Sequence, residues 1–194
     1  MPRDAVRLPA MVTNLDARPI ALVGLMGAGK STVARALGER LGGAVADLDA
    51  MAEAERGCSV AELFEREGEP AFRRLEGRIL DQALAAGAGV ISCGGGIVLD
   101  PAHRAALAAR CRVVWLEVSP ATAVLRLANT GGSRPLLAAG AAGETVAPLL
   151  RLEALLAVRR PLYEQVALAR VSVEGRTADE VADEVLRVLG RRAG

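Results

Sequence analysis

Short apolar runs alternate with longer segments of helical periodicity along most of the chain. The apolar runs predict five strands, at residues 20–23, 44–46, 89–92, 113–116 and 171–173. These runs are apolar at most successive positions, as expected for strands that are covered on both faces of a parallel sheet. The alternation of strands with helices indicates an α/β fold, with a five-stranded parallel sheet flanked by helices in three layers.

Capping residues mark where the helices are expected to begin and end. Ser59 with Glu62 fits a capping box, and Gly68 predicts the end of that helix. Pro70 suits the first turn of a second helix, which the pattern continues to residue 87. Further helix starts are predicted at Asp100-Pro101, at Ser119-Pro120 and at Thr177 with Glu180.

Composition limits the number of domains and the kinds of partner. The 194 residues suit one domain, and 52% of them are hydrophobic, which is enough for a core. Lys and Arg number 24 and Asp and Glu 23, so a net charge of +1 gives no indication of a nucleic-acid or membrane partner. We expect a monomer with a loose leader at residues 1–18 and a single domain at 19–194. The segment 128–147 is rich in Gly, Ala and Pro and predicts a lid.

The cysteines indicate the compartment. Cys58, Cys93 and Cys111 are odd in number and have no CxxC spacing. They predict reduced thiols and a reducing, cytoplasmic environment. No apolar run reaches the roughly 20 residues that a membrane-spanning helix requires.

A phosphate-binding loop follows the first predicted strand. Gly24–Ser31 fits the pattern G-x-x-x-x-G-K-[ST], with a strand before it and a helix after it. Backbone N–H groups of such a loop surround a phosphate, while Lys30 can reach the β- and γ-phosphates and the Ser31 hydroxyl can bind Mg²⁺. The motif predicts ATP and Mg²⁺ as cofactors but leaves kinase, ATPase and GTPase open. The residues expected to bind the nucleotide here are Gly27, Ala28, Gly29, Lys30, Ser31 and Thr32.

Five further motifs follow the phosphate-binding loop and narrow the possible functions. They are Asp47-Leu-Asp49, Phe72-Arg73-Arg74-Leu-Glu76, Cys93-Gly94-Gly95-Gly96, Arg134-Pro-Leu-Leu137 and Arg159-Arg-Pro-Leu-Tyr163. In this order, and over about residues 19–190, the sequence resembles the shikimate kinase family. The resemblance implies transfer of the γ-phosphate of ATP to the 3-hydroxyl of shikimate, on the route to chorismate and the aromatic amino acids.

The two aspartates are expected to divide the metal and acceptor roles. We expect Asp47 and Asp49, at the end of the second predicted strand, to point to opposite sides, so that one can face Mg²⁺ and the other the acceptor. The resemblance assigns Asp47 to the metal and Asp49 to the shikimate hydroxyls. Asp49 is also the candidate base for the attacking hydroxyl. The alternative is that Asp49 caps the helix that follows it.

Shikimate carries a carboxylate, which arginine binds well through its planar fork. The resemblance places Arg73 and Arg159 on that carboxylate and Gly95 against the substrate. Glu76 lies three residues after Arg73 on the same helical face and can orient its guanidinium. The glycine triplet could instead serve only as a tight turn. Phe64 and Phe72 match apolar pocket positions but suit core packing almost as well, and Arg74 and Arg160 are expected to be structural.

The lid and the nucleotide edge carry the last assignments. By the resemblance, Arg134 is the catalytic lid arginine that neutralises the transferring phosphoryl group, and it contacts the nucleotide. Arg176 resembles the adenine-side arginine, with a plain surface charge as the alternative. The family often has arginine just before the threonine that opens the lid, where this chain has Asn129. His103 is expected to be a surface or capping residue without a catalytic role.

Two other functions remain open at this point. A gluconate-type sugar-acid kinase would share the phosphate-binding loop and the lid. A ligand-binding sensor without turnover would share the fold, although Lys30, Ser31 and Asp49 favour turnover.

Overall fold

The computed structural model describes residues 18–129 and 146–190 of the chain. Five strands form one sheet in the order β2-β3-β1-β4-β5, and every neighbouring pair is parallel. The predicted five-stranded parallel α/β fold is therefore confirmed, with each strand within two residues of its expected bounds. The strands are β1 (Ile20–Val23), β2 (Val45–Asp47), β3 (Val90–Ser92), β4 (Arg112–Glu117) and β5 (Ala169–Ser172).

Eight helical segments connect and follow the strands in the described part of the chain. They are α1 (Lys30–Leu41), α2 (Leu48–Arg56), α3 (Val60–Ala85), the short 3-10 helix η1 (Ile97–Leu99), α4 (Pro101–Arg110), α5 (Pro120–Asn129), α7 (Val146–Val166) and α8 (Ala178–Gly190).

The predicted helix boundaries are confirmed by hydrogen bonds. Ser59 and Glu62 form a reciprocal capping box at the start of α3. Asp100 accepts from the backbone N–H of Ala102 at the start of α4. Gly68 interrupts α3 at φ 76° and ψ 168°, so the predicted stop separates two helical segments and Pro70 begins the second. Ser119 and Thr177 cap α5 and α8 in the same way.

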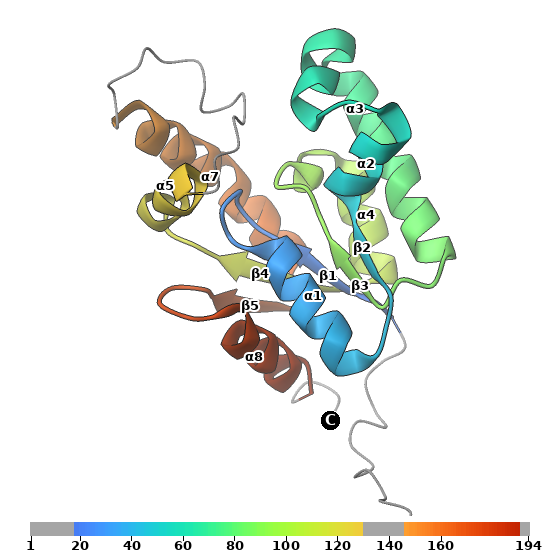
Figure 1. Cartoon of the computed structure of the whole chain (residues 1–194), viewed down its shortest axis with the longest axis vertical. Helices are drawn as coiled ribbons and strands as arrows, with labels where there is room; N and C mark the ends of the chain where they lie inside the picture. Colours follow the sequence, from blue (N-terminus) through green and yellow to red (C-terminus); the bar gives the residue numbers. More distant parts are fainter. Residues whose placement is uncertain (1–17, 130–145, 191–194) are drawn as a thin grey trace, which may run out of the picture.

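Alternating strand residues build two cores, one on each face of the sheet. Ile20 and Leu22 of β1 pack with α1, α5 and α8, whereas Ala21 and Val23 pack with α2, α3 and α4. All four side chains are almost completely buried. α7 contributes to both cores, with Leu152 on the first and Tyr163 on the second. The result is the three-layer arrangement that was predicted from the pattern (Figure 1).

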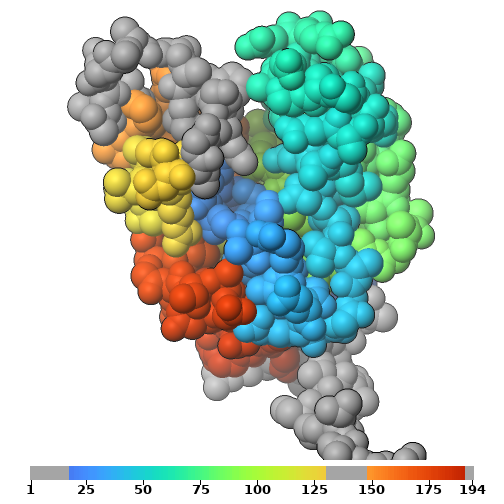
Figure 2. Space-filling view, in the orientation of Figure 1, coloured from blue at the N-terminus to red at the C-terminus, as the bar shows by residue number. Residues whose placement is uncertain are grey.

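The order of the strands determines which loops meet. Because all five are parallel, the segments after them leave from the same edge of the sheet. β1 is central, so the phosphate-binding loop lies between the loop after β3 and the loop after β4. Ligands bind at such positions in open α/β sheets, where the strand order reverses. In Figure 2 the surface that follows β1 lies in a hollow between the α2–α3 region and α5.

Some expectations concern residues outside the described ranges. These include residues 1–17 of the expected leader, residues 130–145 of the expected lid, and Arg134. Within the described ranges the three cysteines are free thiols, with Cys93 and Cys111 buried. No helix in this part of the chain combines the length and apolarity needed to cross a membrane.

Candidate active site

The phosphate-binding loop owes its shape to glycines at φ values that other residues rarely adopt. Gly24 has φ 144°, and a Cβ there would lie 2.4 Å from the carbonyl oxygen of Leu116. Gly27 and Gly29 both have φ 80°. The side chain of Lys30 crosses the loop, and its Nζ donates to the carbonyl oxygens of Gly24 and Leu25 at 3.0 and 3.1 Å. α1 begins at Lys30, so its positive end is directed at the loop.

A cavity of about 500 Å³ extends from this loop along the edge of the sheet where the strands end. It brings together residues 27–32, all predicted to bind the nucleotide, with Asp49, Asn129 and Arg176. Arg176 is exposed but lines the predicted nucleotide cavity, so its role on the nucleotide stays a prediction. The volume falls within the range of ~300–1,000 Å³ that is typical of small-molecule sites.

The part of the sheet edge expected to hold Mg²⁺ is formed by α1, β2 and β3, and of its residues Ser31 and Ser92 line the cavity whereas Asp47 does not. Ser31 Oγ lies 3.4 Å from Ser92 Oγ, and Ser92 pairs in register with Asp47 of the neighbouring strand. In the described ranges, no three His, Cys, Asp or Glu residues gather as a metal site on their own. Mg²⁺ at nucleotide sites takes one or two protein ligands and fills the others with phosphate and water, so a hydroxyl and a nearby carboxylate fit it.

The expected geometry of the two aspartates is wrong. β2 ends at Asp47 and α2 begins at Leu48, so the two residues do not lie on one extended segment, and positions i and i+2 of such a segment would share a face. Asp47 caps α2 by accepting from the backbone N–H of Ala50 at 3.2 Å, and the capping role considered for Asp49 belongs to Asp47. Asp49 lies in the first turn of α2. The side chains still have different surroundings, because the turn from strand to helix separates them.

The glycine triplet after β3 is the point where the predicted acceptor residues meet. A Cβ on Gly94 would lie 2.8 Å from Asp49 Oδ1, and a Cβ on Gly96 would lie 2.5 Å from Arg73 Nη2. A Cβ on Gly95 would lie 3.5 Å from Arg159 Nη1. Gly94 and Gly96 thus make room for polar side chains of α2 and α3, while Gly95 lies closest to the backbone of the phosphate-binding loop, 3.3 Å from the carbonyl oxygen of Gly24. This close packing is a requirement on the triplet in addition to that of a turn.

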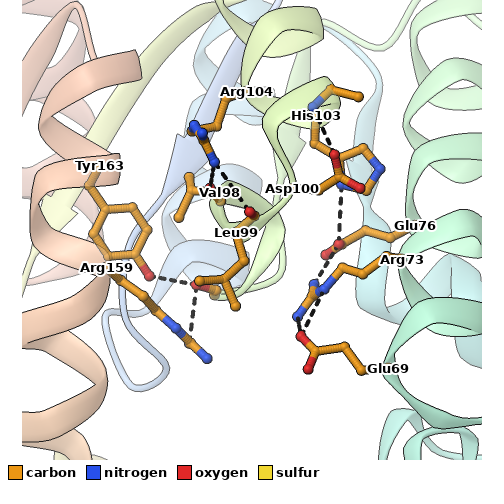
Figure 3. Close-up of polar contacts among 12 residues, drawn as sticks. Glu69, Arg73, Glu76, Val98, Leu99, Asp100, His103, Arg104, Arg159 and Tyr163 are labelled. Atoms are coloured by element: carbon orange, nitrogen blue, oxygen red, sulfur yellow. Dashed lines mark hydrogen bonds and ion pairs between the residues drawn. The ribbon is translucent and has the colours of Figure 1, made fainter.

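Arg73 is fixed by two carboxylates and two rings. Its Nη1 donates to Glu76 Oε2 at 2.6 Å, while Nε and Nη2 contact Glu69 at 3.3 and 3.1 Å (Figure 3). The guanidinium carbon lies 5.8 and 5.4 Å from the ring centres of Phe64 and Phe72. Burial lowers the pKa of Arg73, but the charge of Glu76 and the hydrogen bond to it outweigh burial and raise it. The predicted orienting role of Glu76 agrees with this contact.

Arg159 approaches the triplet from the opposite side. It is only 7% exposed, and its Nη1 donates to the carbonyl oxygen of Gly95 at 3.2 Å. Tyr163, one turn later on α7, donates to the same oxygen at 2.6 Å. Burial raises the pKa of Tyr163 to about 12, so this hydroxyl stays protonated. Figure 3 shows Arg159 and Arg73 on opposite sides of the loop after β3.

The expected position of His103 is wrong. It is 7% exposed, and its Nδ1 lies 3.5 Å from Oε2 of Glu76, the carboxylate that holds Arg73. Sequence distance concealed this contact, because α4 and α3 are neighbours only in the folded chain. Arg74 and Arg160 have other surroundings: Arg74 is exposed, although it lines a cleft beside Arg73, and Arg160 contacts Glu117 at 3.4 Å.

Arg126 was missed by sequence reasoning. It lies on α5 at the cavity, and its Nη1 and Nη2 donate to the carbonyl oxygens of Gly27 and Val173 at 3.4 and 2.9 Å. It lies one helical turn before Asn129, the position where an arginine was expected. The spacing i, i+3 on the predicted helix was the signal that could have identified it. The nucleotide edge therefore has an arginine from α5 as well as Arg176.

A phosphate-binding loop beside a glycine triplet on which two arginines and an aspartate converge is the arrangement expected of one class, the P-loop kinases of small molecules. The sequence model of the family "Shikimate kinase" matches residues 26–190, and the chain belongs to this family.

Individual relatives agree with the family match. A shikimate kinase of Symbiobacterium thermophilum is 42% identical over 173 residues, which cover 89% of this chain and 97% of the relative. The solved structure of shikimate kinase from Acinetobacter baumannii in complex with shikimate is similar with a TM-score of 0.81 and 33% identity, covering 90% and 94% of the two chains. A gluconokinase structure from Sinorhizobium meliloti, at 20% identity and a TM-score of 0.53, shares the fold alone.

Proposed function

We propose that this protein transfers the γ-phosphoryl group of Mg·ATP to the 3-hydroxyl of shikimate, giving shikimate 3-phosphate and ADP. The observation that carries the proposal is the convergence of Asp49, Arg73 and Arg159 on the glycines after β3, next to the phosphate-binding loop. Two arginines suit a carboxylate, and an aspartate suits a hydroxyl. Membership of the shikimate kinase family supports the same acceptor.

The nucleotide is bound at residues 27–32, with its β- and γ-phosphates on the backbone N–H groups and Lys30. Lys30 is already directed across the loop by two carbonyl oxygens, so little rearrangement is needed. Arg126 and Arg176 lie at the edge of the same cavity and bind the rest of the nucleotide. Arg134 is proposed as the lid arginine on the transferring group.

Ser31 and Asp47 would hold Mg²⁺, Ser31 through its hydroxyl and Asp47 through a bound water. The ion would offset the charge of the β- and γ-phosphates. The contact between Ser31 and Ser92 fixes the hydroxyl that the ion needs.

The acceptor lies between Arg73 and Arg159, which bind its carboxylate, while Asp49 faces the reacting hydroxyl. Asp49 accepts the hydroxyl proton as the oxygen attacks the γ-phosphorus and the bond from that phosphorus to the β-phosphate oxygen breaks. Glu76 keeps Arg73 in place during these steps.

The three free thiols favour a reducing compartment, and we propose the cytoplasm.

The test is a coupled ADP-release assay with shikimate and with gluconate as acceptors. We expect turnover that requires Mg²⁺ and ATP and is at least ~100-fold more efficient with shikimate, because only a matched pocket pairs all of its buried polar groups. Lys30→Ala should abolish turnover with an unchanged Tm, since it removes a charge from a loop. Preference for gluconate would overturn the acceptor, and near-normal turnover by Lys30→Ala would overturn the nucleotide site.

A further inference from the structure

A buried histidine lies directly behind the arginine that is proposed to bind the acceptor. His103 is 7% exposed and Glu76 is 2% exposed. Nδ1 of His103 lies 3.5 Å from Oε2 of Glu76, and the same oxygen accepts from Arg73 Nη1 at 2.6 Å. Figure 3 shows His103, Glu76 and Arg73 in one line that leads from α4 to the site.

Two polar atoms in this line are buried without a hydrogen bond. They are His103 Nδ1 and Glu76 Oε1. The separation of 3.5 Å to Oε2 is too long for a good hydrogen bond, so the histidine and the carboxylate face each other without satisfying each other. Unsatisfied buried polar groups are costly, and where they persist a functional reason is a common explanation.

α3 has a glycine where the imidazole needs space. Gly77 lies in the interior of α3, and a Cβ at that position would lie 2.7 Å from His103 Nε2. Glycine inside a helix is destabilising relative to alanine. Gly77 therefore makes room for the ring beside Glu76.

The ring can exchange protons with solvent. His103 lines an open cleft of about 1030 Å³, together with Arg73, Gly77 and Asp100. The contact with Glu76 raises the pKa of His103 and outweighs burial, which lowers it. The charge of Asp100 at the cap of α4 also raises this pKa, and the charge of Arg73 lowers it. The helices η1 and α7 and the strand β4 also pack against α4, and they contain no group that contributes to this shift of the His103 pKa.

We propose that His103 is a positioning residue for the acceptor, and that its protonation strengthens binding of the acceptor carboxylate through Glu76 and Arg73. The inference rests on the proposed function, because it needs a carboxylate at Arg73. When the imidazole is neutral, the negative charge of Glu76 offsets much of the positive charge of Arg73. When the imidazole is protonated, it balances Glu76, and the charge of Arg73 is left for the ligand. Acceptor affinity should therefore fall as pH rises through the His103 titration.

Thermodynamic linkage between acceptor binding and protonation of His103 gives the expected size of the pKa change, which is a second quantity to measure. Binding of the carboxylate must raise the pKa of His103 by the logarithm of the factor by which protonation raises affinity. A threefold change in affinity corresponds to a shift of about 0.5 pKa unit. Because the chain contains one histidine, its imidazole signal in NMR spectra of the tag-free protein is unambiguous.

The experiment measures the Kd for shikimate without ATP, between pH 5.5 and 8.5, in the full chain. We expect the Kd to rise about three- to tenfold over this range, and saturating shikimate to raise the NMR-determined pKa of His103 by about 0.5–1 unit. His103→Gln should give a Kd that is constant with pH and similar to the high-pH value of the unmodified chain, with kcat unchanged. Arg78→Gln is the matched control, because Arg78 lines the same cleft but pairs with Glu55. It should keep the pH dependence.

The outcomes separate this inference from the proposed function. Shikimate binding with the same Kd at all pH values, and an imidazole pKa that shikimate leaves unchanged, would overturn the role of His103 while the kinase assignment stands. Absence of shikimate binding at any pH would overturn both. The NMR measurement needs no variant, so a poorly folded His103→Gln leaves the test intact. Gly77→Ala adds a further check, since it should displace the ring and lower the pKa of His103.

Discussion

Asp49 and Asp47 lie two positions apart but have different neighbours. Asp49 faces Gly94 and the cavity, whereas Asp47 caps α2 next to the Ser31–Ser92 pair. Asp49→Asn keeps the size of the side chain but removes its charge and its ability to accept a proton. We expect kcat to fall by about 10²–10⁴ with the Kd for ATP little changed.

The matched control for this prediction is Asp47→Asn. Asp47→Asn should lower the affinity for Mg²⁺, so that more Mg²⁺ is needed for turnover, and should leave the Kd for shikimate nearly unchanged. If Asp49→Asn instead weakened ATP binding as much as turnover, Asp49 would belong to the metal and the two roles would be exchanged.

At the residue scale, sequence reasoning succeeded where the chemistry is local. Gly27–Ser31 requires only its own spacing, and Glu76 requires only the helical distance from Arg73. It failed for His103 and Arg126, whose partners are distant in sequence. Arg126 contacts Gly27, which is 99 positions away. Such contacts depend on how helices pack, and a periodic pattern carries no information on that.

The kink in α3 determines the direction of the segment that carries Arg73. Gly68 has φ 76° and ψ 168°, a combination that only glycine adopts readily, while a Cβ there would meet nothing closer than Pro70 Cδ at 3.8 Å. Gly68→Ala should therefore act through backbone strain, lowering Tm by about 3–10 °C and raising the KM for shikimate. Gly190→Ala is the control, since a Cβ there meets nothing within 4 Å and needs no positive φ. An unchanged Tm in Gly68→Ala would show that the kink relaxes without cost.

α5 connects the phosphate-binding loop to the end of β5 through Arg126. Each of its two contacts is to a carbonyl oxygen, and the guanidinium lies at the nucleotide cavity. Arg126→Ala should raise the KM for ATP about 10- to 100-fold, the loss expected for one charge-assisted hydrogen bond. The Kd for shikimate should stay constant, because the acceptor side is formed by α2, α3 and α7.

Arg160→Ala is the matched control for α5, since Arg160 is a partly exposed arginine that contacts Glu117 away from both cavities. Equal effects of the two variants on the KM for ATP would contradict a nucleotide role for Arg126.

At the scale of helices and strands, the capping residues predicted the helix starts well. The boundary between β2 and α2 was missed because Asp47 ends the strand and caps the helix at once.

At the scale of the whole molecule, the sheet order brings the site together. The parallel pattern predicted five strands whose ends share one edge, but not that β3 and β4 would flank β1. Strand order depends on pairing between segments far apart in the chain, so the alternation of strands and helices leaves it open. The resemblance supplied what the pattern could not, namely that α3 and α7 face the same loop.

The convergence of α3 and α7 on one loop can be tested by changing Arg73 on α3 and Arg159 on α7. If both bind one carboxylate, each single change to alanine should raise the Kd for shikimate about 10- to 100-fold with the Kd for ATP nearly constant. The double variant should lose less than the sum of the two free energies, by at least about 0.5 kcal/mol, because the two residues share one ligand group. Arg74→Ala, an exposed arginine beside Arg73, is the control and should leave the Kd unchanged.

Replacing Arg73 also affects the stability of the protein, and the double-mutant cycle with Arg159 must take this into account. Glu76 is 2% exposed, so Arg73→Ala leaves a buried carboxylate without its main partner and should lower Tm. Arg73→Lys keeps the charge beside Glu76 but loses the planar fork, so it should retain more of the Tm and still bind shikimate markedly more weakly. The double-mutant cycle of Arg73 and Arg159 is therefore measured once with Arg73→Ala and once with Arg73→Lys, by calorimetric titration of shikimate into folded protein. Strictly additive losses in both cycles would mean that the two arginines do not share a carboxylate, and an unchanged Kd in every single variant would place the acceptor elsewhere.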